Sequence, residues 1–333
     1  MSECRPVPGP LALVTGGTGF IGARLVRDLA KDGMSVRVFA RHVDAAVGAY
    51  GVVEMMAGDV RDRQSVRRAM EGVRWVFHLA GKAHDLSEMG DSTAHDEITV
   101  KGTQHVVDEA VAHGVERFVF LSSLAVYKAE QRQLDESAIC APSTAYGRAK
   151  LEAQRYVLTR ARAIHVSCLQ PAMVYGPGCK GNLPRMMAMI QRGWFPPVPD
   201  VANRRSLAFL VDVVRAIRLA AQHAAANGQC FIVTDGECYS TKRIYEAVCR
   251  GLNRNVPRWC VPASAFRFLA RVGDFYGTLR HKRFPFDSHA YDKLFGSAWF
   301  SGDKIRRELA FEPSATLESA MPLLLDRSNR GAR

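Results

Sequence analysis

The feature that most constrains the fold of this chain is a glycine-rich segment near its start. Residues 15–22 read TGGTGFIG and contain the pattern G-x-G-x-x-G. They lie between an apolar run, Leu11–Thr15, and a segment whose apolar residues repeat at helical spacing, Phe20–Lys31. Glycines at such a junction allow a tight turn, a close approach of backbone to phosphate, and close packing of the helix on the strand. The segment therefore predicts a strand–turn–helix unit whose helix N-terminus faces a nucleotide phosphate.

The rest of the first half alternates between strand and helix patterns. The expected strands are Val36–Ala40, Val53–Ala57, Trp75–Ala80, Arg117–Leu121 and Ile164–Gln170, and the expected helices are Arg63–Met70, Ile98–His113 and Tyr146–Arg162. This alternation predicts an α/β protein with a Rossmann, doubly wound parallel sheet. After Pro171 the rhythm loosens. We expect a NAD(P)-binding domain over residues 10–171 and a smaller C-terminal α/β substrate-binding domain over 172–325, interleaved with the first.

Composition excludes several classes of protein. The net charge is +12, but the 45 Lys and Arg residues are spread along the chain, so we expect no nucleic-acid partner. The eight Cys form no CxxC pair, and no His pair at metal-ligand spacing lies beside them. We therefore expect no metal site and a cytoplasmic protein with reduced thiols. No apolar stretch reaches the roughly 18 residues of a membrane-spanning helix, so we expect no membrane span.

A second constellation, Ser123, Tyr146 and Lys150, carries acid–base chemistry. Tyr146 and Lys150 stand at i and i+4 in a predicted helix and share one of its faces. A free Tyr has a pKa of about 10. A nearby ammonium and the positive ring of an oxidised nicotinamide stabilise the phenolate and lower that pKa. Tyr146 can then take a hydroxyl proton as hydride leaves the same carbon, while Ser123 bonds the same oxygen.

The end of the second strand favours NADP over NAD. A strong NAD site has Asp or Glu there, bonding both ribose hydroxyls, whereas this chain has Ala40–Arg41. Arg41 suits a 2′-phosphate, although it could also be a solvated loop charge. Asp59, after the third strand, can accept the adenine amino group. The small residues after the fourth strand let a cofactor lie against the backbone.

These motifs together resemble the extended short-chain dehydrogenase/reductase superfamily, in its NAD-dependent epimerase/dehydratase branch of nucleotide-sugar enzymes. The likeness runs over about residues 10–325 through TGGTGFIG, GDV, FHLAG, VKGT, FVFLSSLAVY, YGRAK and PAMVYGPG. It implies that Ser123, Tyr146 and Lys150 are catalytic, with Lys150 also holding the nicotinamide ribose. It implies a homodimer that pairs the two long helices of the first half. The implied cofactor contacts are Gly16, Gly19, Phe20, Ile21, Gly22, Arg41, Asp59, Val60, Leu79, Ala80, Lys82, Tyr146, Lys150 and Pro171.

The resemblance also implies a nucleotide-sugar substrate. Asn182 resembles the residue that bonds the substrate diphosphate, and Arg205 resembles the Arg that clamps it, with Ser123 at the sugar. A guanidinium suits this role because its planar fork pairs phosphate oxygens. Four positions depart from the family pattern: Thr99 stands where Asn is usual, Gln170 where Arg is common, Lys128 where Gly is common, and no Arg lies near Trp299 at the second diphosphate position.

The residues after the catalytic Ser decide which reactions remain. Sugar 4,6-dehydratases of the family have an Asp–Glu pair there, and 3,5-epimerising reductases use a Cys–His pair, whereas this chain has Leu124–Ala125. Two reactions of a UDP-sugar remain open, 4-epimerisation and 4-keto reduction. Arg41 leans toward the reductase, and the branch resemblance leans toward the epimerase.

Two other classes of function stay as alternatives. The superfamily includes 3β-hydroxysteroid dehydrogenases, and the segment Phe266–Arg283 mixes apolar and basic residues that could touch a membrane surface or form a packed lid. A non-catalytic NADP-sensing binder is the other alternative, against which the intact Ser, Tyr and Lys set argues.

Overall fold

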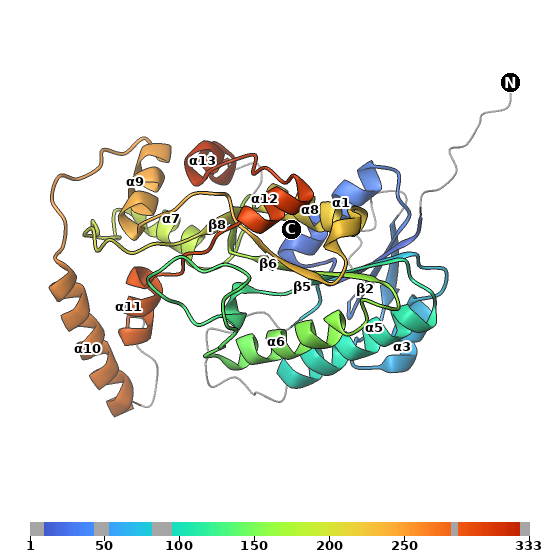
Figure 1. Cartoon of the computed structure of the whole chain (residues 1–333). Coiled ribbons are helices and arrows are strands. Elements are labelled where there is room, and N and C mark those ends of the chain that lie inside the picture. Colours follow the sequence, from blue (N-terminus) through green and yellow to red (C-terminus); the bar gives the residue numbers. More distant parts are fainter. Residues whose placement is uncertain (1–9, 43–52, 82–94, 281–285, 327–333) are drawn as a thin grey trace, which may run out of the picture.

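The computed structural model describes residues 10–42, 53–81, 95–280 and 286–326. Its centre is a seven-stranded parallel sheet in the order β3-β2-β1-β4-β5-β6-β9 (Figure 1). The strands are β1 (Ala12–Thr15), β2 (Val36–Ala40), β3 (Val53–Ala57), β4 (Trp75–His78), β5 (Arg117–Leu121), β6 (His165–Pro171) and β9 (Gln229–Val233). The order reverses between β1 and β4, which is the topological switch point where doubly wound sheets bind their ligands. The predicted Rossmann fold is confirmed.

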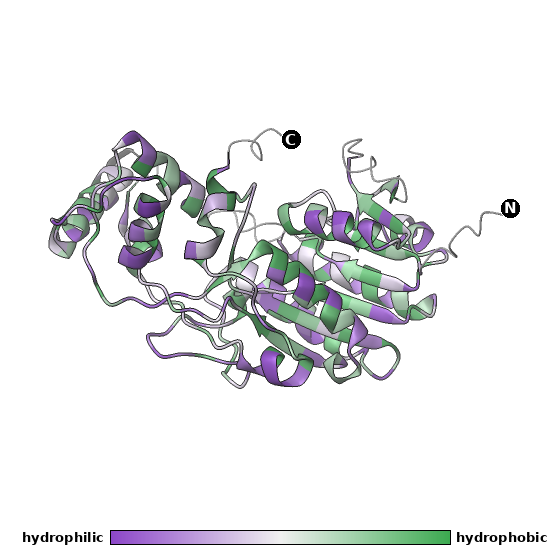
Figure 2. Cartoon of the chain, turned by 90° about the horizontal axis from the view of Figure 1, so that it is seen from above, coloured by the Kyte–Doolittle hydropathy of each residue, from purple (hydrophilic) through white to green (hydrophobic). Residues whose placement is uncertain are grey.

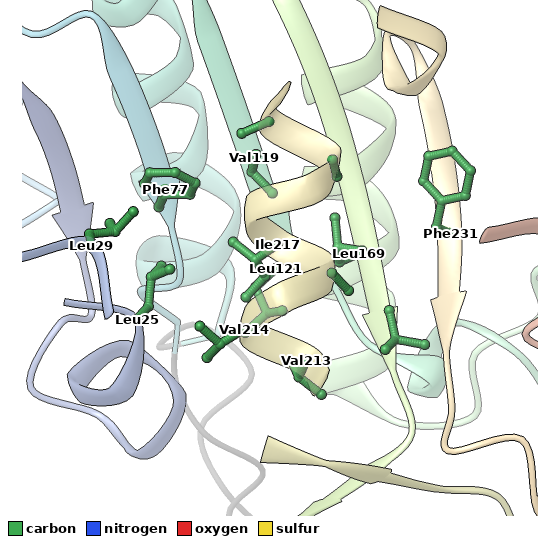
Figure 3. Packing of buried hydrophobic residues seen from close by; sticks show 14 of the residues in the cluster. Leu25, Leu29, Phe77, Val119, Leu121, Leu169, Val213, Val214, Ile217 and Phe231 are labelled. Carbon is green, nitrogen blue, oxygen red and sulfur yellow. The ribbon is translucent and has the colours of Figure 1, made fainter. Parts of the chain in front are cut away.

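Helices cover both faces of the sheet. On one face lie α1 (Phe20–Lys31) and α8 (Leu210–Gln222), and on the other α3 (Arg63–Ala69), α5 (Gly102–Ala112) and α6 (Ala145–Leu158) (Figure 1). Figure 3 shows the first face, where the buried side chains of α1 and α8 meet those of the strands, among them Leu25, Ile217, Phe77 and Leu169. The strands carry near-continuous apolar runs because both of their faces are buried.

The second half of the chain returns to this sheet. Strand β9 pairs with β6, α8 packs on β5 and β6, and α12 (Asp303–Leu309) packs on β9. The remaining elements form a separate C-terminal lobe around a core of their own: β7 (Met173–Tyr175), β8 (Leu207–Phe209), α7 (Asn182–Arg192), α9 (Thr241–Gly251), α10 (Ala263–Arg280), α11 (Ser288–Phe295) and α13 (Leu317–Leu325). This lobe is mostly helical, with β7 and β8 as a parallel pair.

The strands and the helices differ in hydropathy. In Figure 2 the strands of the sheet are mostly green, whereas the helices of both parts alternate between purple and green along their length. In the part of the chain that the structure describes, no helix combines the length and apolar character needed to span a bilayer.

One predicted helix is built differently from its pattern. Ile98–His113 was expected to be a single regular helix, but its first turns are a π-helix, Asp96–Lys101, that continues into α5. A π-helix inside a helix is rare and is frequent at functional sites. Here it places Thr99 and Val100 in buried positions beside the end of β4.

Candidate active site

The turn between β1 and α1 has room for backbone only. Gly16 has a left-handed φ of 71°, and a Cβ on it would lie 2.8 Å from the amide nitrogen of Ala80. A Cβ on Gly22 would overlap the carbonyl oxygen of Gly16. No side chain caps the N-terminus of α1, and its N-cap glycine is exposed. The amides of Phe20 and Ile21 at this helix end therefore form a site that suits an anion.

A buried chain of hydrogen bonds holds the end of β4 against this turn. The Thr103 hydroxyl donates to the Thr99 carbonyl at 2.5 Å, so it must accept from Nε2 of His78 at 2.9 Å. Nδ1 of His78 then accepts from the Thr15 hydroxyl at 2.7 Å, and that oxygen accepts from the Ala80 amide at 3.1 Å. Every link has a direction, which fixes the His78 ring as neutral.

Burial enforces the same charge state on this histidine. His78 is fully buried, and this burial, with a smaller contribution from Lys150, lowers its pKa to about 3. The ring also stacks on Phe120 with 5.7 Å between the ring centroids. It is therefore a structural residue that joins β1, β4 and α5.

The proposed catalytic side chains meet where β5 ends and α6 begins. Ser123 caps the short helix after β5, and Tyr146 and Lys150 lie one turn apart in α6. The Lys150 ammonium is buried, donates to the Leu121 carbonyl at 2.7 Å, and lies 4.7 Å from the centre of the Phe120 ring. Burial lowers the pKa of Lys150 to about 8.

The pKa of Tyr146 differs from the sequence expectation. Burial raises it above the ordinary value, and the hydrogen bond with Ser123 lowers it by a smaller amount. The protein alone therefore keeps the phenol protonated. Stabilisation of a phenolate at this position therefore needs further positive charge close to the phenol, such as that of an oxidised nicotinamide.

Close packing sets the geometry between Ser123 and Tyr146. A Cβ on Gly147 would overlap the carbonyl oxygen of Ala125, two residues after Ser123. The hydroxyl of Thr144 accepts from the Gly147 amide at 3.0 Å and so fixes the first turn of α6. Glycine at 147 is what allows this turn to press against the segment that carries Ser123.

Gly81, Thr99 and His95 lie beside the proposed catalytic side chains, and the sequence did not predict them there. A Cβ on Gly81 would lie 3.2 Å from Nζ of Lys150 and 3.7 Å from Oγ1 of Thr99. The ring of His95 packs edge-on to Tyr146, with 6.0 Å between the ring centroids. Thr99 could have been found as the departure from the family pattern, but nothing in the sequence marked His95.

The expected adenosine side of the site is rich in charge. Asp59 receives three hydrogen bonds from the side chain of Arg61, the closest at 2.7 Å, and one from its amide at 2.9 Å. The Arg61 bond is the main cause that lowers the pKa of Asp59, and exposed Arg41 contributes less. Arg61 thus competes for the carboxylate expected to meet adenine. Buried Val60 lies next to it, and Lys82 falls outside the described residues.

The glutamine before Pro171 belongs to a buried network of neutral hydrogen bonds. Gln170 is fully buried, and its amide donates to the Gln154 side chain at 2.9 Å, which also accepts from the Ser122 hydroxyl at 2.7 Å. The side-chain oxygen Oε1 of Gln170 accepts from the Tyr127 hydroxyl at 3.1 Å. A charged Arg, which the family resemblance led us to expect here, would have no counter-ion among these neutral groups, so glutamine fits the position.

The proposed substrate residues lie in the C-terminal lobe, in unlike surroundings. Asn182 is exposed at the first position of α7. The guanidinium of Arg205 is partly buried and donates to the carbonyls of Lys293 and, at 3.0 Å, Gly296 at the C-terminus of α11. Burial lowers the pKa of Arg205. Arg205 therefore holds the end of a helix, and only its unused N–H groups are available to a ligand.

The fold and the cluster at the sheet edge define a dinucleotide-dependent enzyme of the oxidoreductase kind. A family model described as "NAD dependent epimerase/dehydratase family" matches residues 12–233, and the chain belongs to this family.

Its relatives are uniformly distant and differ in substrate. A UDP-glucose 4-epimerase from Vibrio cholerae is 28% identical over 322 residues, covering 92% of each chain. Sterol demethylase protein B from Methylococcus capsulatus is 30% identical, covering 91% of this chain and 94% of the relative. The solved structure of MoeE5 in complex with UDP-glucose and NAD superposes with a TM-score of 0.77 at 22% identity, over 98% of this chain and all of that one.

Proposed function

We propose that this enzyme transfers hydride at C4 of a UDP-sugar, with Tyr146 as the acid–base group. The observation that carries the proposal is the meeting of Ser123, Tyr146 and Lys150 at the sheet edge, next to a turn that admits only backbone. This turn suits a dinucleotide diphosphate, because the glycines at 16 and 22 let its backbone pack closely on the segment after β4 and on the start of α1, and no side chain caps that helix end. The glycine turn and the start of α1 would hold a nicotinamide dinucleotide, which would supply the hydride acceptor and donor.

The residues divide the work at one carbon. When the C4–H bond breaks and hydride leaves, the C4 hydroxyl proton passes to the Tyr146 oxygen. Ser123 donates to the same sugar oxygen and orients it. Lys150, one turn along the helix, supplies positive charge beneath the phenol and a donor for a ribose hydroxyl. The reverse step returns the proton to the sugar oxygen as hydride adds to the carbon.

The reaction is either 4-epimerisation or 4-keto reduction. The positions after Ser123 are apolar, Leu124 and Ala125, so no side chain there can protonate a leaving 6-hydroxyl. Dehydration is therefore not part of the proposal. In an epimerase the 4-keto sugar rotates in the site between two hydride transfers, so there is no net change in the cofactor. In a reductase a single hydride transfer leaves the cofactor oxidised.

For the cofactor we propose NADP, with NAD as the alternative. Arg41 is exposed at the end of β2 and close enough to Asp59 to lower the pKa of that carboxyl. A guanidinium here suits a 2′-phosphate. MoeE5 binds NAD, so a preference for NADP would set this chain apart from that structural neighbour.

For the substrate we propose that Asn182 and the unused donors of Arg205 bind the diphosphate. Both lie in the C-terminal lobe, and an uncapped helix start at Asn182 favours anions. We also propose a homodimer through α5 and α6, which lie side by side and are joined within one chain by Tyr156, Arg160 and Asp108 (Figure 1).

Oxidation of a lipid hydroxyl, as in 3β-hydroxysteroid dehydrogenases, is the second candidate. It is favoured by the sterol demethylase relative and by the aromatic residues exposed on α10. The test is incubation with UDP-GlcNAc, UDP-glucose and a UDP-4-keto-6-deoxy sugar, each with and without NADPH. Conversion without net cofactor use identifies the epimerase, and stoichiometric NADPH oxidation identifies the reductase. Turnover of a sterol alone would overturn the sugar proposal.

A further inference from the structure

Helix α10 has two apolar faces: among the described residues, one packs against α11, and the other is largely exposed. Its inner face is anchored by Phe266, which is 6% exposed and packs edge-on against Phe295 of α11 with 5.2 Å between the ring centroids. Ala270, one turn on, is also buried. Asp274 accepts from the Ser288 amide at 3.0 Å and from its hydroxyl at 2.5 Å, which ties α10 to the start of α11. These contacts fix the rotation of the helix.

The opposite face carries an exposed apolar stripe. It consists of the exposed side chains of Phe268, Leu269, Phe275 and Tyr276 and the half-buried Val272, which follow the i, i+1, i+4, i+7, i+8 spacing of one helix face. Phe268 is 70% exposed and Phe275 is 68% exposed. Figure 1 shows α10 at the outer end of the C-terminal lobe, with α11 beside it. We call these five residues the outer stripe.

Positive charge borders the outer stripe. Arg267 and Arg271 are exposed and stand one turn apart on its flank. The lone acidic side chain of α10, Asp274, is bound to Ser288 of α11. Trp259, just before the helix, is 65% exposed. An apolar face with arginines on its flank and an aromatic residue at its end is the composition of a helix that lies in a membrane interface.

From this arrangement we propose that the outer stripe binds the surface of an anionic membrane, with α10 lying in the plane of the headgroups. The helix has 18 residues and is amphipathic, and no helix of the described chain can span a bilayer, so it lies on the membrane. A second copy of the chain fits less well. Two-fold pairing through this face would bring the arginines of both copies together. Anionic headgroups are complementary to the same arginines. The proposal concerns a surface and stands whichever sugar reaction the enzyme performs.

Sedimentation of the full-length protein with lipid vesicles tests this proposal. The wild type should pellet with phosphatidylcholine vesicles that contain phosphatidylglycerol, and much less with phosphatidylcholine alone. The double variant Phe268→Ser/Phe275→Ser should bind at least about tenfold more weakly, because apolar area buried in the interface contributes to binding. The matched control is Ile139→Ser, an 89% exposed apolar side chain on a loop far from α10 in sequence, which should bind as the wild type does.

A charge variant separates the two contributions. Arg267→Gln/Arg271→Gln should weaken binding roughly thirtyfold, since each basic residue near an anionic surface contributes about a fivefold increase in affinity. Arg67→Gln/Arg307→Gln, elsewhere on the surface, should have little effect. Thermal melts and turnover of the soluble sugar should be unchanged in all four variants, so a failed vesicle test leaves the proposed reaction standing.

Three results would overturn the proposal. They are the absence of wild-type binding to anionic vesicles, equal binding by the Phe268→Ser/Phe275→Ser variant, and a dimer in solution that this variant dissociates. The last result would identify a second copy as the occupant of the outer stripe.

Discussion

The carboxyl ends of the sheet strands are closely packed and hydrogen-bonded, whereas the C-terminal lobe leaves more of its polar and apolar side chains exposed. At the sheet edge the His78 chain of hydrogen bonds has a defined direction at each step, and glycines at 16, 22 and 147 bring backbones into contact. In the lobe, Asn182 is exposed, Arg205 is occupied with a helix end, and α10 leaves aromatic side chains in solvent. From this difference we infer that the groups proposed for the chemistry are held by the sheet, and we expect selectivity for the substrate to depend on the lobe.

The largest expected effect tests the chemistry of the sheet edge. Tyr146→Phe should lower kcat about a thousandfold, because it removes the acid–base group while leaving the cofactor turn intact. Steady-state kinetics and cofactor titration measure the two effects separately. Tyr156→Phe, on the same helix, removes a bond to Asp108 and should leave kcat within about twofold of the wild type. Unchanged turnover in Tyr146→Phe would show that Tyr146 is not the acid–base group, whereas absence of turnover in the wild type would favour the non-catalytic binder.

Gly22→Ala tests the backbone contact at the turn. Its Cβ would overlap the Gly16 carbonyl, so α1 must move and cofactor affinity should fall roughly ten- to a hundredfold. Gly33→Ala is the control, because Gly33 has a φ of 79° but no atom within 4 Å of a new Cβ. That variant should lose about 1 kcal/mol of stability and keep cofactor affinity. Equal affinities in both variants would remove the turn from the cofactor site.

The buried hydrogen bonds that keep His78 neutral predict that the stability of the protein depends on pH. The pKa of His78 is about 3 in the folded protein, against about 6.5 for a solvent-exposed histidine, so the unfolded chain binds an extra proton between these values. The free energy of unfolding should therefore fall by about 1.4 kcal/mol per pH unit from this residue as pH drops from 6.5 toward 3. Urea unfolding across that range measures it, and the slope should be smaller in His78→Gln. Equal slopes in the two proteins would show that His78 is not kept neutral.

Arg41→Ala should separate the two cofactors. Loss of a charged hydrogen bond to a 2′-phosphate should weaken NADP binding about tenfold and leave NAD binding nearly unchanged. Isothermal titration with each dinucleotide measures the ratio, with Arg67→Ala as a control for the loss of positive charge. An equal loss for both dinucleotides would make Arg41 a solvated loop residue.

The smallest effect is expected in the lobe. Asn182→Ala should raise KM for the UDP-sugar about threefold to tenfold with kcat unchanged, because one neutral hydrogen bond to the diphosphate is lost in ground and transition states alike. A fall in kcat of the size expected for Tyr146→Phe would show that the lobe takes part in the chemistry, and the contrast between the two regions would fail.

The sequence predicted the features that depend on residues close together in the chain. The glycine turn, the strand–helix alternation of the first half and the i, i+4 pair Tyr146–Lys150 depend on spacing within one or two elements, and the Rossmann fold that they predicted is confirmed. The hydrogen bonds of His78 with Thr15 and Thr103 join residues 63 and 25 positions apart, so no local pattern marks them.

Other features were hidden because they depend on competing partners. Asp59 could be read from its strand end, but its pairing with Arg61 depends on the conformation after β3. Arg205 matched a family position, yet its bonds to the end of α11 come from residues about 90 positions away. The raised pKa of Tyr146 follows from burial, which spacing alone does not give.

The most direct test of the central claim is the reaction run in deuterium oxide, with the product's carbon-bound hydrogens assigned by NMR. Hydride transfer at C4 beside Tyr146 predicts no solvent deuterium on the sugar carbons, because the moving hydrogen travels between C4 and the cofactor. Deuterium at C3 or C5 of the product would mean proton abstraction next to a carbonyl, and would contradict the account.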